Sequence, residues 1–399
     1  MLVTRPELVF VSPRFLFPAD SGGAIRTTEI LRNMRGGKFR IRLLSPATGD
    51  QEERHVTQLA QIADRWNFWP AQKSTATAAA RRLPLLASHL PLAVASDRSS
   101  AGIKLISNAL AERPGVVVFD FLHSAVLAPS LLDVPSVLFT HNVEAEIVER
   151  HLLHATRWWQ KRIWRSQLVK MRRFERDALL RFDRIVAVSA RDAQRFREEC
   201  GAEHVDVIPT GVNLDYFHFA PSEPDGRVVF AGSMDWLANI DAVRWFRAAI
   251  WPQIKAQHPT ATMTVIGRNP PADLRSTSLS DWTMTGRVDD IRPYVHKATV
   301  YVIPMRIGGG TRIKAFEAMA MGVPVVSTSV GMEGLDVEPG RHYLQADTQE
   351  QFAQAVVSLL LRPELGRTLA DQARQHVQQH YSNAKVARAF EKICEQAMR

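Results

Sequence analysis

Residues 308–326 read GGGTRIKAFEAMAMGVPVV and follow an apolar run, 299–303, with the composition of a buried strand. The glycines let the backbone approach a ligand closely, and the apolar segment after them predicts a helix whose first N–H groups face the loop. Gly322 and Pro324 end this short helix, and another apolar strand begins at Val325. The stretch therefore predicts a strand, a loop, a helix and a strand, which is the unit of a parallel α/β sheet and a cradle for a diphosphate.

Charged side chains within this unit indicate what it binds. Arg312 and Lys314 fall in the first helical turn, where a cation opposes the helix dipole unless an anion offsets it, so both are expected to bind phosphate. Glu317 is a lone carboxylate on an apolar helix, and its burial would cost several kcal/mol without hydrogen bonds, which ribose hydroxyls would supply. The alternatives are a structural ion pair for Glu317 and solvated surface positions for the two cations. The loop residues expected to line the cradle are Gly309, Gly310 and Thr311.

The same alternation of short strands and long helices extends over the whole chain. Strands are predicted at 8–11, 40–44, 116–119, 137–139 and 184–188, and again at 227–231, 263–266, 299–303 and 325–327. Proline and glycine are frequent between 209 and 226, which places a domain boundary near residue 215. We expect an α/β protein with domains at 1–215 and 216–380, followed by an amphipathic helix at 381–399 that packs back on the first domain.

Composition limits the function classes. A chain of 399 residues with 46% hydrophobic residues suits two globular domains. The two cysteines, Cys200 and Cys394, are too few for a disulfide framework and lack zinc-site spacing, and neither a secretion signal nor an apolar run long enough to cross a bilayer is visible. A cytoplasmic location is therefore expected. The net charge of +9 favours an anionic partner without choosing one.

A basic segment carries interleaved tryptophans. Between residues 157 and 176 eight arginines and lysines surround Trp158, Trp159 and Trp164, with Glu175 as the one acid. Such a helix can lie on the anionic inner face of a membrane, which would suit a lipid-linked substrate. The alternative is a solvated helix whose tryptophans pack inward.

At this point the chain resembles the family-4 glycosyltransferases over nearly its whole length. The matching stretches are 308–326, Phe230 to Trp236 with Asn239 and Asp241, 327–334, and, more loosely, 20–26, 141–144, 188–189 and 209–212. The resemblance implies a GT-B fold, in which two Rossmann-like doubly wound domains face a central cleft. It also implies a metal-independent retaining transferase of polysaccharide biosynthesis that moves a hexose from a UDP or GDP donor to a glycan or lipid-linked glycan, with the donor bound mainly by the second domain.

The resemblance assigns roles within the second domain. Glu317 corresponds to the second acid of the family's Glu-x7-Glu motif, in agreement with the ribose-binding role argued from its burial. Gly309 stands where the first acid would be, so the usual contact to a donor-sugar hydroxyl is unassigned. The family's arginine and lysine after the first strand of this domain are also absent. Arg312 and Lys314, with Arg268 as a further candidate, are therefore expected to support the leaving diphosphate.

In the first domain the candidate residues follow predicted strand ends. Gly22 and Gly23 would let a loop approach the donor, although an ordinary turn explains them equally well. His123 and His141 each follow a strand end, and the family carries one histidine here that contacts the donor sugar; either could instead be a loop or core histidine. The residues expected to bind the acceptor or orient an imidazole, with helix capping as the alternative, are Asp120, Asn142 and Glu144.

Two other functions remain compatible with the sequence. A nucleotide-sugar epimerase of the same fold would convert the donor without an acceptor. A catalytically silent nucleotide-sugar-binding partner is suggested by Gly309 at the position of the motif acid. A nucleic-acid-binding protein is suggested by charge alone, and no recognition module supports it, so no nucleic-acid partner is expected.

Overall fold

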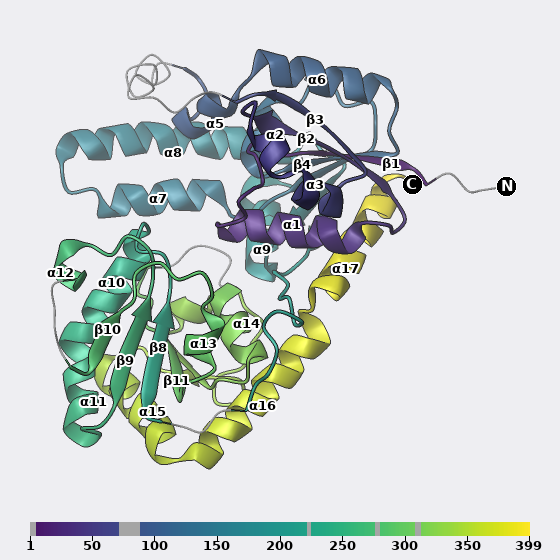
Figure 1. Ribbon diagram of the computed structural model, residues 1–399. Coiled ribbons are helices and arrows are strands. Elements are labelled where there is room, and N and C mark those ends of the chain that lie inside the picture. Colours follow the sequence, from purple (N-terminus) through teal and green to yellow (C-terminus); the bar gives the residue numbers. More distant parts are fainter. Residues whose placement is uncertain (1–4, 72–87, 222–224, 276–279, 308–312) are drawn as a thin grey trace. The chain divides into compact units, whose positions relative to one another are not determined.

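The computed structural model describes residues 5–71, 88–221, 225–275, 280–307 and 313–399 (Figure 1). The chain divides into two compact units, Met1–Pro209 with Ala384–Arg399, and Thr210–Asn383. The sequence placed the boundary near residue 215 and a separate helix at the end.

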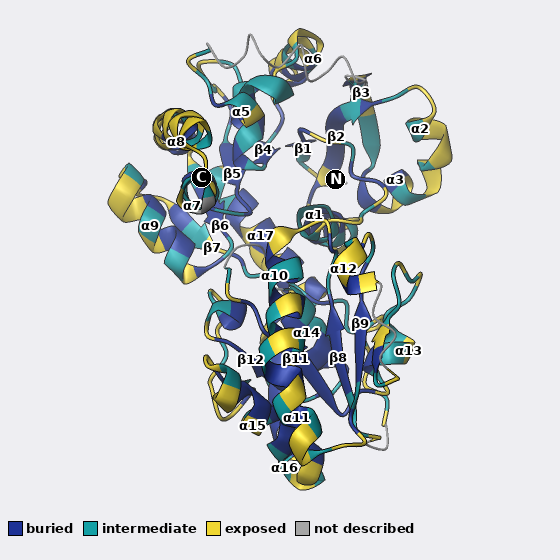
Figure 2. Cartoon of the chain, turned by 90° about the vertical axis from the view of Figure 1, so that its left-hand side faces the viewer, coloured by how far each residue is buried: buried dark blue, intermediate teal, exposed yellow. Residues whose placement is uncertain are grey.

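The first unit is built on a parallel sheet ordered β3-β2-β1-β4-β5-β6-β7. Its apolar strands are almost wholly buried, as expected of a sheet covered on both faces (Figure 2). The strands are β1 (Glu7–Val11), β2 (Arg40–Ala47), β3 (Arg65–Pro70), β4 (Val116–Asp120), β5 (Ser136–Phe139), β6 (Arg184–Ala187) and β7 (Val205–Val207).

Helices cover both faces of this sheet and form two hydrophobic cores. One core joins alternate strand residues such as Val9 and Phe119 to α5, α6, α8 and α9, and the other joins Leu8 and Phe10 to α1, α3 and α17. The helices are α1 (Gly22–Met34), α2 (Gln51–Arg54), α3 (Val56–Ile62), α5 (Leu92–Asp97), α6 (Ser100–Ala111), the 3₁₀ helix η2 (Leu122–Val126), α7 (Glu144–His154), α8 (Trp158–Leu179), α9 (Ala190–Cys200) and α17 (Asn383–Ala397).

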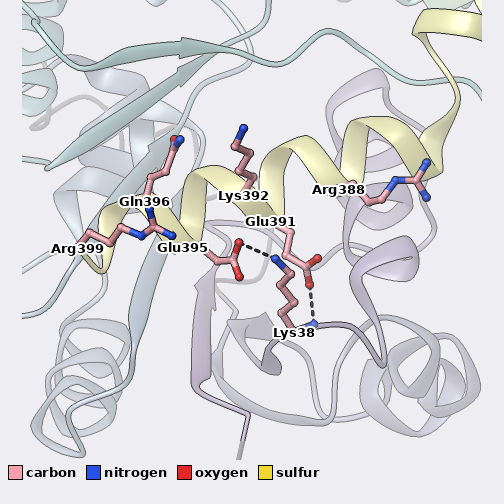
Figure 3. A pocket seen from close by; sticks show the side chains of 7 residues that line it. All are labelled: Lys38, Arg388, Glu391, Lys392, Glu395, Gln396 and Arg399. Atoms are coloured by element: carbon pink, nitrogen blue, oxygen red, sulfur yellow. Dashed lines mark hydrogen bonds and ion pairs between the residues drawn. The ribbon is translucent and has the colours of Figure 1, made fainter.

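Helix α17 is part of the first unit. Phe390 is fully buried in its core, and the Glu391 carboxylate accepts a hydrogen bond from the Lys38 backbone N–H at 2.7 Å. The Lys38 ammonium lies 2.7 Å from Glu395 (Figure 3). A surface pocket of about 330 Å³ borders this helix. It is lined by Lys38, Arg388, Glu391, Lys392, Glu395, Gln396 and Arg399.

The second unit repeats the same strand order, as β10-β9-β8-β11-β12-β13, all parallel. Its strands are β8 (Arg227–Ala231), β9 (Thr262–Ile266), β10 (Trp282–Met284), β11 (Val300–Ile303), β12 (Val325–Ser327) and β13 (Leu344–Gln345). Its helices are α10 (Leu237–Trp245), the π-helix η3 (Phe246–Ile250), α11 (Trp251–Gln257), α12 (Ala272–Arg275), α13 (Arg292–Val295), α14 (Ile313–Ala320), the 3₁₀ helix η4 (Val330–Met332), α15 (Gln349–Leu361) and α16 (Pro363–His380).

The strand order fixes where ligands bind. In each sheet the first strand, β1 or β8, lies at the point where the chain reverses its direction of winding, next to β4 or β11. Ligands of such sheets bind beyond the carboxyl ends of the strands at this switch point. Several of the described candidates lie at such strand ends or on the helix that follows: Asp120 ends β4, His141 follows β5, Arg268 follows β9 and Glu317 lies on α14.

Candidate functional site

The glycine loop of the second unit is only partly described. Gly309, Gly310, Thr311 and Arg312 lie outside the described residues, so their predicted roles stay predictions. The helix that follows is α14, and Gly322 closes it with a φ of +78°, in the left-handed region that favours glycine.

Glu317 lies on α14 beside Tyr301 of β11, and its side chain is half-buried. Among the described residues no hydrogen bond reaches its carboxylate. Burial raises the pKa of Glu317 to about 7, and the nearby Lys314 only partly offsets this. A carboxylate held here without donors is costly, and a ligand hydroxyl would satisfy it.

Lys314 reaches across to the end of β8. Its ammonium donates a hydrogen bond to Asn239 Oδ1 at 2.9 Å and lies 4.5 Å from the centroid of the Phe230 ring. The Asn239 amide donates in turn to the Ser233 carbonyl at 2.8 Å. Lys314 and Glu317 are therefore both placed beside the β8–β11 switch point, where a phosphate and a ribose could be held one turn apart.

Two glycines keep the loops of this edge close together. A Cβ on Gly267 would lie 2.2 Å from the Gly232 carbonyl oxygen, and a Cβ on Gly232 would lie 2.9 Å from the Asn239 side chain. Both contacts are too short for any larger residue. The sequence singles out the stretch that contains Gly232. It does not predict that Gly232 packs against Gly267, because this contact depends on β8 and β9 being neighbours in the sheet.

The Arg268 side chain contacts polar side chains of its own unit. Its Nε lies 2.8 Å from Asp235 Oδ2 and 3.2 Å from Ser233 Oγ, and Asn269 donates to the same carboxylate at 2.9 Å. Asp235 thus balances the charge that the sequence assigned to a diphosphate. The assignment of Arg268 to the donor stays a prediction.

In the first unit, Gly22 and Gly23 open α1. A Cβ on Gly23 would lie 2.4 Å from Cζ of Phe121 and 3.6 Å from Nδ1 of His141. The Phe121 ring leaves no room for a side chain at Gly23, whereas the distance to the imidazole is an ordinary contact, and a donor-binding role for this loop stays a prediction.

His141 and Asp120 form a buried pair. His141 Nε2 lies 2.7 Å from Asp120 Oδ1, and the Thr27 hydroxyl donates to Asp120 Oδ2 at 3.0 Å. Burial lowers the pKa of His141, although Asp120 opposes that shift. The sequence named Asp120 and His141 without pairing them, and it missed Thr27.

His123 occupies a different environment. Its Nδ1 lies 3.2 Å from Asp97, and its Nε2 lies 3.5 Å from Glu144. Burial alone would lower the pKa of His123, but the two carboxylates outweigh it and raise the pKa to about 9. Glu144 also bonds to Asn142, and its pKa is lowered because the His123 contact outweighs the effect of burial. His123 is thus an imidazolium that joins α5 to α7, and the sequence missed its partner Asp97.

Two further ionisable side chains are buried in this unit. Arg26 of α1 donates to the carbonyls of Thr140 and Ile208, and burial lowers its pKa to about 9. Glu175 of α8 accepts the Glu144 N–H at 2.8 Å, so it caps the start of α7. Burial raises the pKa of Glu175 to about 8. The sequence names Glu175 as the one acid of the basic segment, but it does not show that this side chain faces inward.

Helix α8 lies beside α7 (Figure 1). Its tryptophans differ in how far they are exposed. Trp164 stacks on His151 with ring centroids 4.7 Å apart, whereas Trp158 is 76% exposed and Trp159 is 42% exposed. Inward packing therefore holds for Trp164 but not for Trp158 and Trp159, and contact of this helix with a membrane stays a prediction.

The described part of the chain was also searched for metal sites and membrane spans. It contains no group of three or more His, Cys, Asp or Glu side chains that could hold a metal ion. None of its helices combines the length and the apolar character needed to cross a bilayer.

Comparisons with known proteins identify two family models and a protein to which the chain is similar. A model described as Glycosyltransferase Family 4 matches residues 21–216, and one described as Glycosyl transferases group 1 matches residues 225–362. An uncharacterized 44.6 kDa protein in the cps region of Klebsiella pneumoniae is 22% identical over 405 residues, covering 95% of this chain and 97% of that protein.

Solved structures share the fold. Sucrose-phosphate synthase from Thermosynechococcus elongatus matches with a TM-score of 0.71 and 17% identity over 98% of each chain. HepE from Anabaena, solved in complex with UDP, matches with a TM-score of 0.69 and 14% identity over 98% of this chain and 100% of that one. The expected two-domain α/β fold of the GT-B type is confirmed.

Proposed function

Because the chain belongs to the family-4-type glycosyltransferases, we propose that it transfers a hexose from a nucleotide diphosphate sugar to a glycan or a lipid-linked glycan. The observation that carries this proposal is Glu317, a half-buried carboxylate with a raised pKa and no protein donor among the described residues. It lies at the switch point of the second sheet, where a ribose with two adjacent hydroxyls would satisfy it.

The donor is proposed to be a UDP sugar, with GDP as the alternative. HepE, which shares the fold, has been solved with UDP and with UDP-glucose. Lys314 would lie against the diphosphate, together with Arg312 and the backbone of Gly309, Gly310 and Thr311. The positive charge of the two side chains and the N–H groups of the loop would stabilise the diphosphate as its bond to the sugar breaks. Stabilising this charge is the main requirement of such a leaving group.

The transfer is proposed to retain the anomeric configuration without a metal. Charge on the leaving diphosphate would be met by side-chain and backbone donors, and the diphosphate itself would take the proton of the attacking hydroxyl. His141 is proposed as the first-domain histidine that contacts a sugar, because both nitrogens of His123 already face carboxylates.

The acceptor is proposed to be presented at an anionic membrane on the cytoplasmic side. The exposed Trp158 and Trp159 and the many arginines and lysines of α8 support peripheral contact with such a surface. Binding of this kind needs no membrane-spanning helix.

Product analysis tests the proposed reaction. The protein would be incubated with UDP-glucose or GDP-mannose and a polyprenyl diphosphate-linked glycan, and phosphorus and proton NMR would follow the nucleotide and the sugar. We expect one nucleoside diphosphate released per new glycosidic bond, with an α-linked product. A new sugar nucleotide formed without diphosphate release would instead identify an epimerase, and tight binding without any turnover would identify a silent partner.

A further inference from the structure

Asp120 and His141 lie at the ends of neighbouring strands. Asp120 is the last residue of β4, and His141 follows β5 by two positions. The side chains of His141 and Asp120 are 1% and 0% exposed, and the atoms Nε2 and Oδ1 lie 2.7 Å apart. Two polar groups buried this deeply are expected to be fully hydrogen-bonded.

The Asp120 carboxylate receives donors on both oxygens. The Thr27 hydroxyl lies 3.2 Å from Oδ1 and 3.0 Å from Oδ2, and His141 donates to Oδ1. Since a carboxylate only accepts, the proton of a neutral His141 ring is on Nε2 and its Nδ1 carries a bare lone pair. The ring is neutral because burial lowers its pKa and the nearby Arg26 lowers it further, against the opposing charges of Asp120 and Glu144.

Nδ1 of His141 has no hydrogen-bond partner among the described residues, although the atom is buried. A buried acceptor without a donor destabilises the unliganded protein. The Phe121 ring stacks on the imidazole with centroids 4.0 Å apart, and Gly23 lies at its edge. Phe121 therefore covers one face of the ring, and Gly23, which has no side chain, lies beside Nδ1.

Phe121 holds this position in an unfavourable backbone conformation. Its φ is 64° and its ψ is 145°, a region that residues with a Cβ rarely adopt. Strain of this kind beside an unsatisfied acceptor is typical of a ligand site.

We propose that Asp120 is a positioning residue for glycosyl transfer: it holds His141 in the Nε2–H tautomer, so that Nδ1 accepts a hydrogen bond from a carbohydrate hydroxyl. The inference rests on the proposed function for the presence of a sugar ligand, but the tautomer itself does not. The hydroxyl comes from the donor sugar or from the acceptor, and the experiment separates these two sources.

The test is nitrogen-15 NMR of the histidine rings, with His141 assigned by its loss in His141→Gln. In the free protein we expect a protonated Nε2 and an unprotonated Nδ1. A shift of the Nδ1 signal with UDP-glucose but not with UDP identifies the donor sugar, and a shift with octyl glucoside alone identifies the acceptor. An Nδ1–H tautomer in the free protein, or an Nδ1 signal unchanged by either sugar, would overturn the proposal.

Asp120→Asn provides the kinetic arm. Its amide can donate as well as accept, so we expect the single tautomer to be lost and kcat/KM for transfer to fall about 10- to 100-fold. Calorimetric binding of UDP alone should not change. The control is Asp133→Asn, which makes the same change at an exposed aspartate and should leave both the His141 tautomer and kcat/KM at wild-type levels. A wild-type tautomer and wild-type kinetics in Asp120→Asn would contradict the assignment.

Failure of the proposed function would look different. If the wild-type protein bound neither UDP nor UDP-glucose, the proposed donor would be wrong even though the free-protein tautomer was as expected. The tautomer of His141 in the free wild-type protein is measured without Asp120→Asn, so it tests the proposal even if that variant does not fold.

Discussion

The Nδ1 atom of His123 lies 3.2 Å from the Asp97 carboxylate, and this contact joins the end of α5 to η2. The ring also faces Glu144 at 3.5 Å. Two carboxylates on one buried imidazole make a charged tether between segments far apart in the sequence.

The tether gives the first unit a pH-dependent stability. The folded pKa of His123 is raised from 6.5 to about 9, so its stabilising contribution is complete below pH 6.5 and is lost as the pH rises through about 9. We expect Asp97→Asn to lower the free energy of unfolding by about 1–3 kcal/mol at pH 6 and by less at pH 9.5. Urea unfolding at the two pH values measures this. The exposed Asp133→Asn is the control, and an equal loss at both pH values would argue against the charged tether.

Glu317 should reduce stability when no ligand is bound. Its folded pKa is raised from 4.5 to about 7, so the folded state keeps a proton that the unfolded state has lost, and stability falls as the pH rises across that interval. We expect Glu317→Gln to stabilise the unliganded protein at pH 8 by about 1–2 kcal/mol, a value reduced for the partial exposure of the side chain. Thermal unfolding measures this, with the exposed Glu364→Gln on α16 as the control. A lower melting temperature for Glu317→Gln would mean that an internal partner holds the carboxylate.

Gly23 is predicted to tolerate no side chain. A Cβ there would lie 2.4 Å from the Phe121 ring, so Gly23→Ala must displace Phe121 or the start of α1. We expect a loss of about 1–3 kcal/mol in unfolding free energy and a fall in transfer activity. Gly49→Ala is the matched control, because nothing lies within 4 Å of its Cβ position. Comparable stability of the two variants would show that Phe121 does not pack as described.

The outer face of α8 is predicted to bind anionic bilayers. Trp158 and Trp159 are exposed next to arginines and lysines, so replacing both with serine should weaken binding to vesicles of phosphatidylcholine and phosphatidylglycerol about tenfold or more. Vesicle co-sedimentation at low and physiological salt measures this. Trp236→Ser, in the second unit and also 40% exposed, should bind as the wild type does. No binding by the wild-type protein would rule out this surface.

Much of the fold could be predicted because short, almost wholly apolar strands alternate with helices in both units. The strands that the sequence missed are β3, β7, β10 and β13, all at or near a sheet edge. Strand β3, with the sequence RWNFWP, mixes aromatic and polar residues, and β7, β10 and β13 have only two or three residues each. None of these four strands therefore forms the apolar run by which a buried strand is recognised.

The candidate site could be predicted by position but not by pairing. His123 and His141 both follow strand ends, and the sequence treats them alike. Their roles differ because His141 meets Asp120 from the neighbouring strand, whereas His123 meets Asp97 from a helix. Such partners depend on the order of strands in the sheet, which a single sequence does not state.

The most direct test of the central claim is calorimetric titration of the wild-type protein and Glu317→Gln with UDP, GDP and UDP-glucose. We predict that the wild type binds one nucleoside diphosphate in clear preference to the other. Glu317→Gln should bind it about 10- to 100-fold more weakly, because the neutral amide makes weaker hydrogen bonds to the ribose hydroxyls. Equal affinity in the two proteins, or no binding of any nucleotide to the wild type, would contradict the proposed donor site.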